Sequence, residues 1–151
     1  MIGGAAALAV GWALSVAAAP PAEASTSAAQ RERRAVSAEL SRGLDGLHIE
    51  GADRPYALRA TLQRATLLYI VARYGALSES QLVRRGVGEV EARVGTPERD
   101  STQFFGSGAQ ELFELSLVPD AAATRRAVWL ASDVAFKGAL ESLDMRTAAE
   151  A

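Results

Sequence analysis

The spacing of apolar residues changes several times along this chain, and each change marks an expected element. Between Gln30 and Gly43 the apolar positions recur every fourth residue, at Val36, Leu40 and then Leu44. This spacing predicts an amphipathic helix. The charged run Arg31-Glu32-Arg33-Arg34 is expected to be the part of that helix that faces water.

Strand-like periodicity follows. Tyr56, Leu58, Ala60 and Leu62 alternate with Ala57, Arg59, Thr61 and Gln63, a period of two that predicts a half-buried strand. The dense apolar run Thr66–Tyr74 is suited to a central strand. A helix over residues 56–74 is the alternative, because Leu58, Leu62, Ala65, Tyr69 and Ala72 also fit helical spacing. The β-branched and aromatic residues of the second run favour strands.

Alternation is clearest in Gly86–Gly95. Val90, Ala92 and Val94 point one way, and Glu89, Glu91 and Arg93 point the other. This pattern is typical of an antiparallel sheet with one wet face. Outward-facing side chains on a solvated strand explain the Glu89 and Glu91 pair better than acid/base chemistry does.

The C-terminal part is expected to hold a long connection and then a long helix. Residues Gly95–Val118 contain Pro97, Gly106 and Gly108 and predict the connection. Helical periodicity covers Asp120–Arg146, with Asp120 as N-cap, an Asp133–Lys137 pair at i,i+4 spacing and a frayed end at Thr147–Ala151. Its expected apolar face holds Leu130, Val134 and Gly138, broadened by Trp129, Phe136, Leu140 and Leu143. The expected class is α+β, with a small antiparallel sheet packed by helices and a long C-terminal helix.

The N-terminus resembles an export signal. An apolar stretch, Ala5–Ala19, ends at Pro20-Pro21, and Ala22-Glu23-Ala24 fits the small-x-small pattern before a cleavage site. We therefore expect a signal peptide over residues 1–24, a polar tether over 25–29 and one domain over 30–151, in a periplasmic or extracellular protein. A membrane anchor and an unprocessed tail are the alternatives, although the stretch is short for a span.

Composition limits the chemistry. The chain has no cysteine, which excludes disulfides and thiolate ligands, and its net charge of −2 gives no bulk attraction to nucleic acid. Its one histidine, His48, is expected at the surface, because no nucleophile or ligand set accompanies it. Gly106-Ser107-Gly108 is too short for a phosphate loop, and Asp100-Ser101-Thr102 predicts an Asx or ST turn. No catalytic, cofactor-binding or metal-ligating residue is assigned.

Several segments stand in a familiar order, namely GADRPY at 51–56, YGAL at 74–77, VEARVGTPERDSTQF at 90–104, LVPD at 117–120 and RAVWLASDVAFKGALE at 126–141. Across residues 44–148 this order resembles the N-terminal domain of exported TldD/PmbA-type metallopeptidase-related proteins. In that family the N-terminal domain is a mixed α/β unit. It packs against a C-terminal domain that carries an HExxxH-type zinc helix, and the subunits pair to enclose the site. None of the family's catalytic residues falls on a position of this chain.

The resemblance implies a non-catalytic N-terminal domain, as a truncated or split product, that acts in assembly or substrate enclosure for peptide hydrolysis. Zinc is expected only in the missing C-terminal domain, and the partner is that catalytic domain or a partner subunit. The chain by itself is not expected to be an enzyme. One alternative is a stand-alone periplasmic interaction module that holds a peptide strand. A metal-free hydrolase is a weaker alternative, since no Ser/His/acid set supports it.

Overall fold

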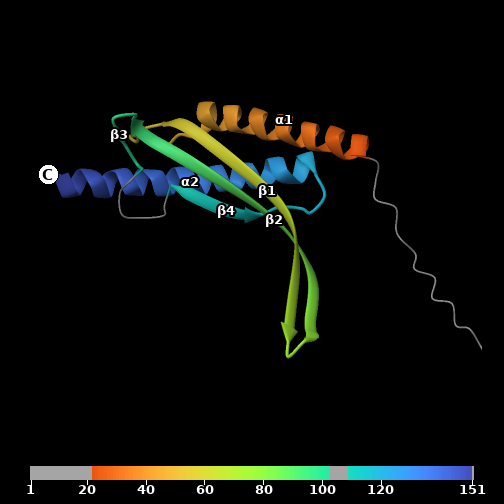
Figure 1. Cartoon of the computed structure of the whole chain (residues 1–151). Coiled ribbons are helices and arrows are strands. Elements are labelled where there is room, and N and C mark those ends of the chain that lie inside the picture. Colours follow the sequence, from red (N-terminus) through yellow and green to blue (C-terminus); the bar gives the residue numbers. More distant parts are fainter. Residues whose placement is uncertain (1–21, 103–108, 151) are drawn as a thin grey trace, which may run out of the picture.

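The computed structural model describes residues 22–102 and 109–150. In chain order the elements are α1 (Ala22–Gly46), β1 (Pro55–Arg73), β2 (Ala76–Thr96), β3 (Arg99–Asp100), β4 (Gln110–Glu114) and α2 (Ala121–Glu150). All strand pairs are antiparallel, with β2 bonded to β1 on one edge and to β3 and β4 on the other. The two helices pack against each other and against the sheet (Figure 1). The expected α+β class is confirmed.

The core lies between β2 and α2. Val90, Ala92 and Val94 have no exposed surface, and they pack against a stripe of α2 that includes Ala135 and Phe136. The prediction that Val90, Ala92 and Val94 share one face of the strand is therefore confirmed.

The expected apolar face of the C-terminal helix is wrong in part. Phe136 is buried, but Leu130 and Val134 are about half exposed. The buried stripe of α2 consists mainly of small side chains: Thr124, Val128, Ala131, Ser132, Ala135, Phe136, Ala139 and Ser142. Small residues let the helix axis approach the sheet closely, so size rather than hydrophobicity selects the packed face.

Residues 55–73 form one continuous strand, so the helical alternative is wrong. The expectation that Thr66–Tyr74 is a buried central strand is also wrong. Leu67, Leu68, Tyr69 and Ile70 are between 53% and 62% exposed. This half of β1 and the facing half of β2 run beyond the helices as a two-stranded ribbon (Figure 1). We call residues 65–85 the β-arm.

Other boundaries differ from the expectations. Residues 25–29, expected as a tether, belong to α1. The expected connection Gly95–Val118 contains β3 and β4. The expected frayed end at Thr147–Ala151 is helical through Glu150, because Arg99 and Arg146 both pair with the Glu150 carboxylate. Most of the expected signal peptide (residues 1–21) and all of Gly106-Ser107-Gly108 lie outside the described residues.

Candidate functional site: a protruding β-arm and its polar root

Arg93 brings together two of the residues singled out in the sequence, because it contacts both Glu91 and Asp100. His48 is exposed just after α1, where it lines a cavity of about 320 Å³ together with Trp129 and Asp133. Within residues 22–102 and 109–150, no group of three or more His, Cys, Asp or Glu side chains is arranged to hold a metal ion. Neither α1 nor α2, over their described residues, combines the length and the apolar content of a membrane-crossing helix.

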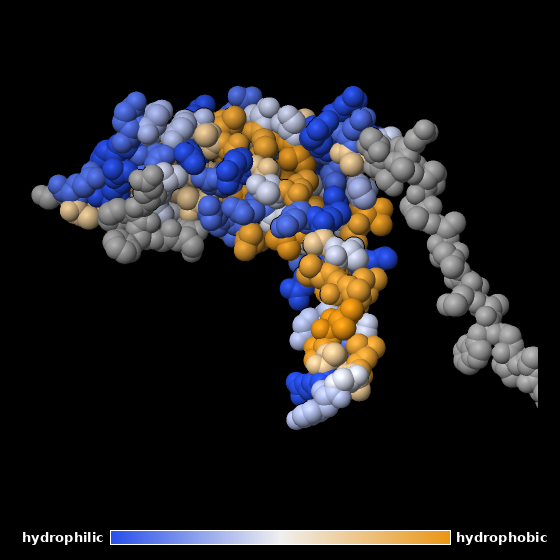
Figure 2. Space-filling model, viewed as in Figure 1, coloured by the Kyte–Doolittle hydropathy of each residue, from blue (hydrophilic) through white to orange (hydrophobic). Residues whose placement is uncertain are grey.

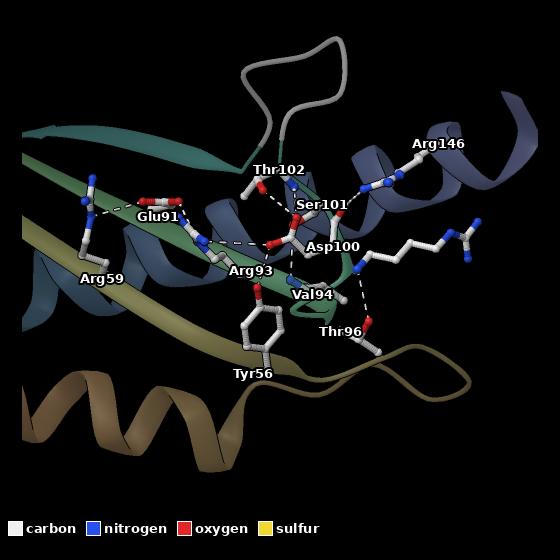
Figure 3. Close-up of polar contacts among 11 residues, drawn as sticks. Tyr56, Arg59, Glu91, Arg93, Val94, Thr96, Asp100, Ser101, Thr102 and Arg146 are labelled. Carbon is white, nitrogen blue, oxygen red and sulfur yellow. Dashed lines mark hydrogen bonds and ion pairs between the residues drawn. The ribbon is translucent and has the colours of Figure 1, made fainter. Parts of the chain in front are cut away.

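Asp100 is the centre of a polar cluster at one end of the sheet (Figure 3). The Thr102 backbone N–H donates to Asp100 Oδ1 at 2.9 Å, which confirms the expected Asx turn. The Tyr56 hydroxyl donates to Asp100 Oδ2 at 2.6 Å, and Arg93 Nη1 lies 3.9 Å from the same oxygen. Arg146 Nη1 donates to the Asp100 carbonyl at 3.0 Å. One residue therefore ties β1, β2, β3 and α2 together.

The ionisation of this cluster suits a structural role. Burial raises the pKa of the Asp100 carboxyl, but hydrogen bonds from Thr102 and Tyr56 more than offset it, so the pKa lies below its usual range. The hydrogen bond to Asp100 raises the pKa of the Tyr56 hydroxyl. At neutral pH Asp100 is therefore a carboxylate and Tyr56 is protonated, and neither is poised to exchange a proton.

Glu91 corrects the expectation of a fully solvated strand face. It lies on the side of β2 opposite Val90, as expected, but its residue is only 7% exposed. Arg93 Nε donates to Glu91 Oε1 at 2.9 Å, and Arg59 Nε lies 3.1 Å from Oε2 (Figure 3). Arg59 from the neighbouring strand β1 and Arg93 from β2 itself thus cover this carboxylate.

The β-arm exposes apolar side chains on both of its faces. Leu67 pairs with Val83, and Tyr69 follows on the same face; Leu68 pairs with Leu82 on the opposite face. Their exposed fractions exceed half for Leu67, Leu68, Tyr69, Ile70, Leu77 and Leu82. In Figure 2 apolar residues cover much of the visible surface of the arm. Taking about 180 Å² for a fully exposed large apolar side chain, these six residues present on the order of 600 Å².

Both edges of the arm are open within the described residues. β4 pairs with β2 only between Val87 and Glu91, so residues 76–86 of β2 have β1 as their one described strand neighbour. Unpaired strand edges carry free N–H and C=O groups that can bond a further strand. Two-stranded ribbons are marginally stable alone in water, so cover from another surface would stabilise the arm.

The tip is a two-residue turn in which both central residues have positive φ, Tyr74 at 52° and Gly75 at 80°. This conformation matches a type I′ turn, which favours Asn-Gly. Tyrosine is disfavoured there because its Cβ crowds the backbone. Tyr74 is also fully exposed at 106% of its reference area, so the turn presents an aromatic ring to solvent at the far end of the arm.

A buried ion pair holds the root of the arm. Arg64 of β1 donates from two nitrogens to the two oxygens of Glu32 in α1, at 2.7 and 2.8 Å. The Thr124 hydroxyl of α2 donates to Glu32 Oε1 at 2.5 Å, and Arg64 Nε donates to the Ser116 carbonyl at 2.7 Å. Glu32 is 3% exposed, so the expectation that it faces water with the neighbouring arginines is wrong.

The strand facing Arg64 also needs a particular residue at the root. Gly86 pairs with Arg64, and its carbonyl accepts a hydrogen bond from the Leu115 N–H at 3.0 Å. A Cβ at Gly86 would lie 2.3 Å from the Leu115 carbonyl oxygen. Glycine therefore allows the segment after β4 to lie directly against β2 where the arm leaves the body.

The sequence analysis predicted neither the exposed β-arm nor the buried Glu32–Arg64 ion pair. The arm has a signal in retrospect, because residues 66–72 lack the polar alternation of a strand with one wet face. No comparable signal marks Glu32, which stands among three arginines in an ordinary charged run.

Comparison with known proteins adds no relative: no protein-family model, no curated protein and no solved structure gives a significant match to this chain. The resemblance to TldD/PmbA-type proteins therefore stays a prediction from the sequence.

Proposed function

We propose that this chain is a non-catalytic domain of an exported TldD/PmbA-like zinc peptidase, and that its β-arm docks onto the catalytic part during assembly or substrate enclosure. The observation that carries the docking role is the uncovered apolar surface on both faces of the arm. Zinc and the peptidase chemistry belong, in this proposal, to the C-terminal domain or to a partner subunit.

The size of the exposed surface supports docking. Monomeric proteins rarely expose contiguous apolar patches above a few hundred Å², and a standard protein interface buries about 800 Å² on each partner. The arm's exposed side chains, on the order of 600 Å² over its two faces together, would supply most of one side of an ordinary interface to a partner that encloses both faces. The exposed and disfavoured Tyr74 at the tip adds an aromatic anchor of the kind enriched at the centres of interfaces.

The root supports the same role. Glu32, Arg64 and Thr124 join α1, β1 and α2 at the point where the arm leaves the body. A fixed arm loses less conformational freedom on binding than a mobile one, which favours affinity.

The experiment begins with the gene. Translating all frames downstream of the Ala151 codon would identify any polypeptide with an HExxxH motif, and that polypeptide would be co-expressed with the tagged chain. We expect the two to co-purify, and we expect the double substitution Leu68→Asp and Ile70→Asp to prevent it. Both side chains are more than half exposed, so the body should still fold.

A matched control replaces two apolar residues of α2 that are about half exposed, Leu130→Asp and Val134→Asp. This control should co-purify like the unchanged chain. Co-purification of the arm variant at the unchanged level would contradict docking through the arm. Stoichiometric zinc binding and peptide cleavage by the chain alone would contradict the non-catalytic assignment.

The open edges favour one alternative, a stand-alone periplasmic module that holds a peptide strand along the arm. If no HExxxH polypeptide is encoded nearby, envelope extract passed over the immobilised chain should yield one defined protein, and the Leu68→Asp and Ile70→Asp variant should lose it. Loss of the same protein with the α2 control variant would count against the arm as the binding surface.

A further inference from the structure

A groove of about 550 Å³ lies between α1 and α2, and no part of the β-arm lines it. Three small alanine side chains leave the space open. Larger side chains complete the lining: the guanidinium groups of Arg42, Arg125 and Arg126, the indole ring of Trp129 and the carboxylate of Glu39. The groove therefore combines three cations, one anion and an aromatic surface.

A ligand entering the groove meets the cations rather than the anion. The Glu39 side chain is 5% exposed, whereas those of Arg42 and Arg125 are 57% and 65% exposed. Arg42 donates to the Glu39 carboxylate, and Arg125 Nε lies 3.7 Å from its other oxygen. Glu39 thus holds two guanidinium groups in place, and the lining keeps a formal charge of +2.

Trp129 supplies an apolar surface beside these charges. Its ring lies 5.9 Å from Arg42 Cζ, a cation–π distance, and the residue is 44% exposed. Arginine held against an aromatic ring keeps its remaining N–H groups free for a carboxylate. The stack places an apolar contact and an anion contact next to each other.

The lining of the groove extends along both helices. It runs from Ala35 to Arg42 on α1 and from Ala121 to Trp129 on α2. At 1.5 Å of rise per residue these segments span about 10–12 Å, which is the length of three to four residues of extended peptide at about 3.3 Å each. The volume also lies in the range of ordinary ligand sites, about 300–1,000 Å³.

We propose that the α1–α2 groove binds a short acidic peptide segment, with its carboxylates on the arginines and an apolar side chain on Trp129. This inference goes beyond the docking role of the β-arm and does not depend on it.

Tryptophan fluorescence gives a direct test. The chain has two tryptophans, Trp12 and Trp129, so in a full-length Trp12→Phe background Trp129 is the sole reporter. The probe is acetyl-Leu-Glu-Glu-Leu-amide, and acetyl-Leu-Gln-Gln-Leu-amide is its neutral control. We expect a saturable change in emission with the acidic peptide and at least about fivefold weaker binding of the neutral one.

Two variants locate the site. Arg126→Gln removes a lining cation that makes no ion pair within the described residues, so it should leave Glu39 and its partners in place. We expect this change to weaken the acidic peptide about three- to fivefold, the upper range for one exposed charge contact. Arg33→Gln, an equal loss of charge at an exposed position of α1 outside the groove, should change binding less than about twofold by the same reasoning.

Three outcomes would overturn the proposal. The first is the absence of any saturable change in Trp129 emission. The second is equal affinity for the acidic and the neutral peptide, and the third is equal weakening by Arg126→Gln and Arg33→Gln. Thermal unfolding followed by circular dichroism would establish that each variant is folded before titration.

Discussion

Removing the guanidinium group at the root of the arm should destabilise the whole domain. The change Arg64→Leu deletes two hydrogen bonds to Glu32 and one to the Ser116 carbonyl, and it leaves a carboxylate that is 3% exposed with Thr124 as its remaining side-chain donor. Breaking a fully buried ion pair from one side costs about 3–5 kcal/mol. The Arg64 side chain is 25% exposed, so partial hydration reduces the expected loss to about 2–3 kcal/mol.

Urea unfolding followed by circular dichroism at 222 nm measures this loss. With a denaturant slope of about 1.5 kcal/mol per molar, the midpoint should fall by about 1.5 M. Glu32→Gln and the double variant complete a double-mutant cycle. The stability loss of the double variant should be smaller than the sum of the two single losses, and the difference should be at least about 1.5 kcal/mol. If Arg64→Leu lowers the urea midpoint by less than about 0.3 M, or if the coupling energy is near zero, the reasoning is refuted.

The same pair predicts a dependence on pH. Burial raises the pKa of the Glu32 carboxyl, but the hydrogen bonds from Arg64 and Thr124 outweigh it and hold the pKa below its ordinary value of 4.5. Since the unfolded state binds the proton more readily, the contribution of Glu32 to stability is fully present above about pH 5 and is lost as the pH falls through the folded-state pKa. Glu32→Gln should therefore show a flatter decline of urea midpoint below pH 4.5 than the unchanged chain.

Three further changes test local geometry through the thermal midpoint. Gly86→Ala should cost about 2 kcal/mol or more, because its Cβ would lie 2.3 Å from a backbone carbonyl oxygen; Gly46→Ala, with nothing within 4 Å, is the control and should not destabilise. Tyr74→Asn should stabilise by about 0.5 kcal/mol, since asparagine tolerates positive φ, and a lower midpoint would contradict the strain at the tip. Tyr56→Phe removes the hydrogen bond to Asp100 and should cost about 1–2 kcal/mol at pH 7. That cost should shrink as Asp100 protonates below pH 3.8, and a constant difference would count against the cluster.

The sequence determined the features that depend on neighbours in the chain. The alternation of Val90, Ala92 and Val94 with charged residues set the inner face of β2, because side chains on a strand point to opposite sides in turn. Asp120 was readable as the N-cap of α2, and its carboxylate accepts hydrogen bonds from the N–H groups of Ala122 and Ala123. The Asp133–Lys137 pair followed from i,i+4 spacing in the same way.

Only the tertiary structure decided which faces are covered. Periodicity says which side chains share a face, but it does not say whether another element reaches that face. The apolar run of Leu67 to Ile70 therefore looked like a buried strand, although α1 and α2 do not cover the β-arm. Glu32 looked like a solvated charge, although Arg64, 32 residues further along the chain, donates to its carboxylate and offsets the cost of burying the charge. Both outcomes depend on contacts between residues far apart in the sequence, and local spacing carries no record of those contacts.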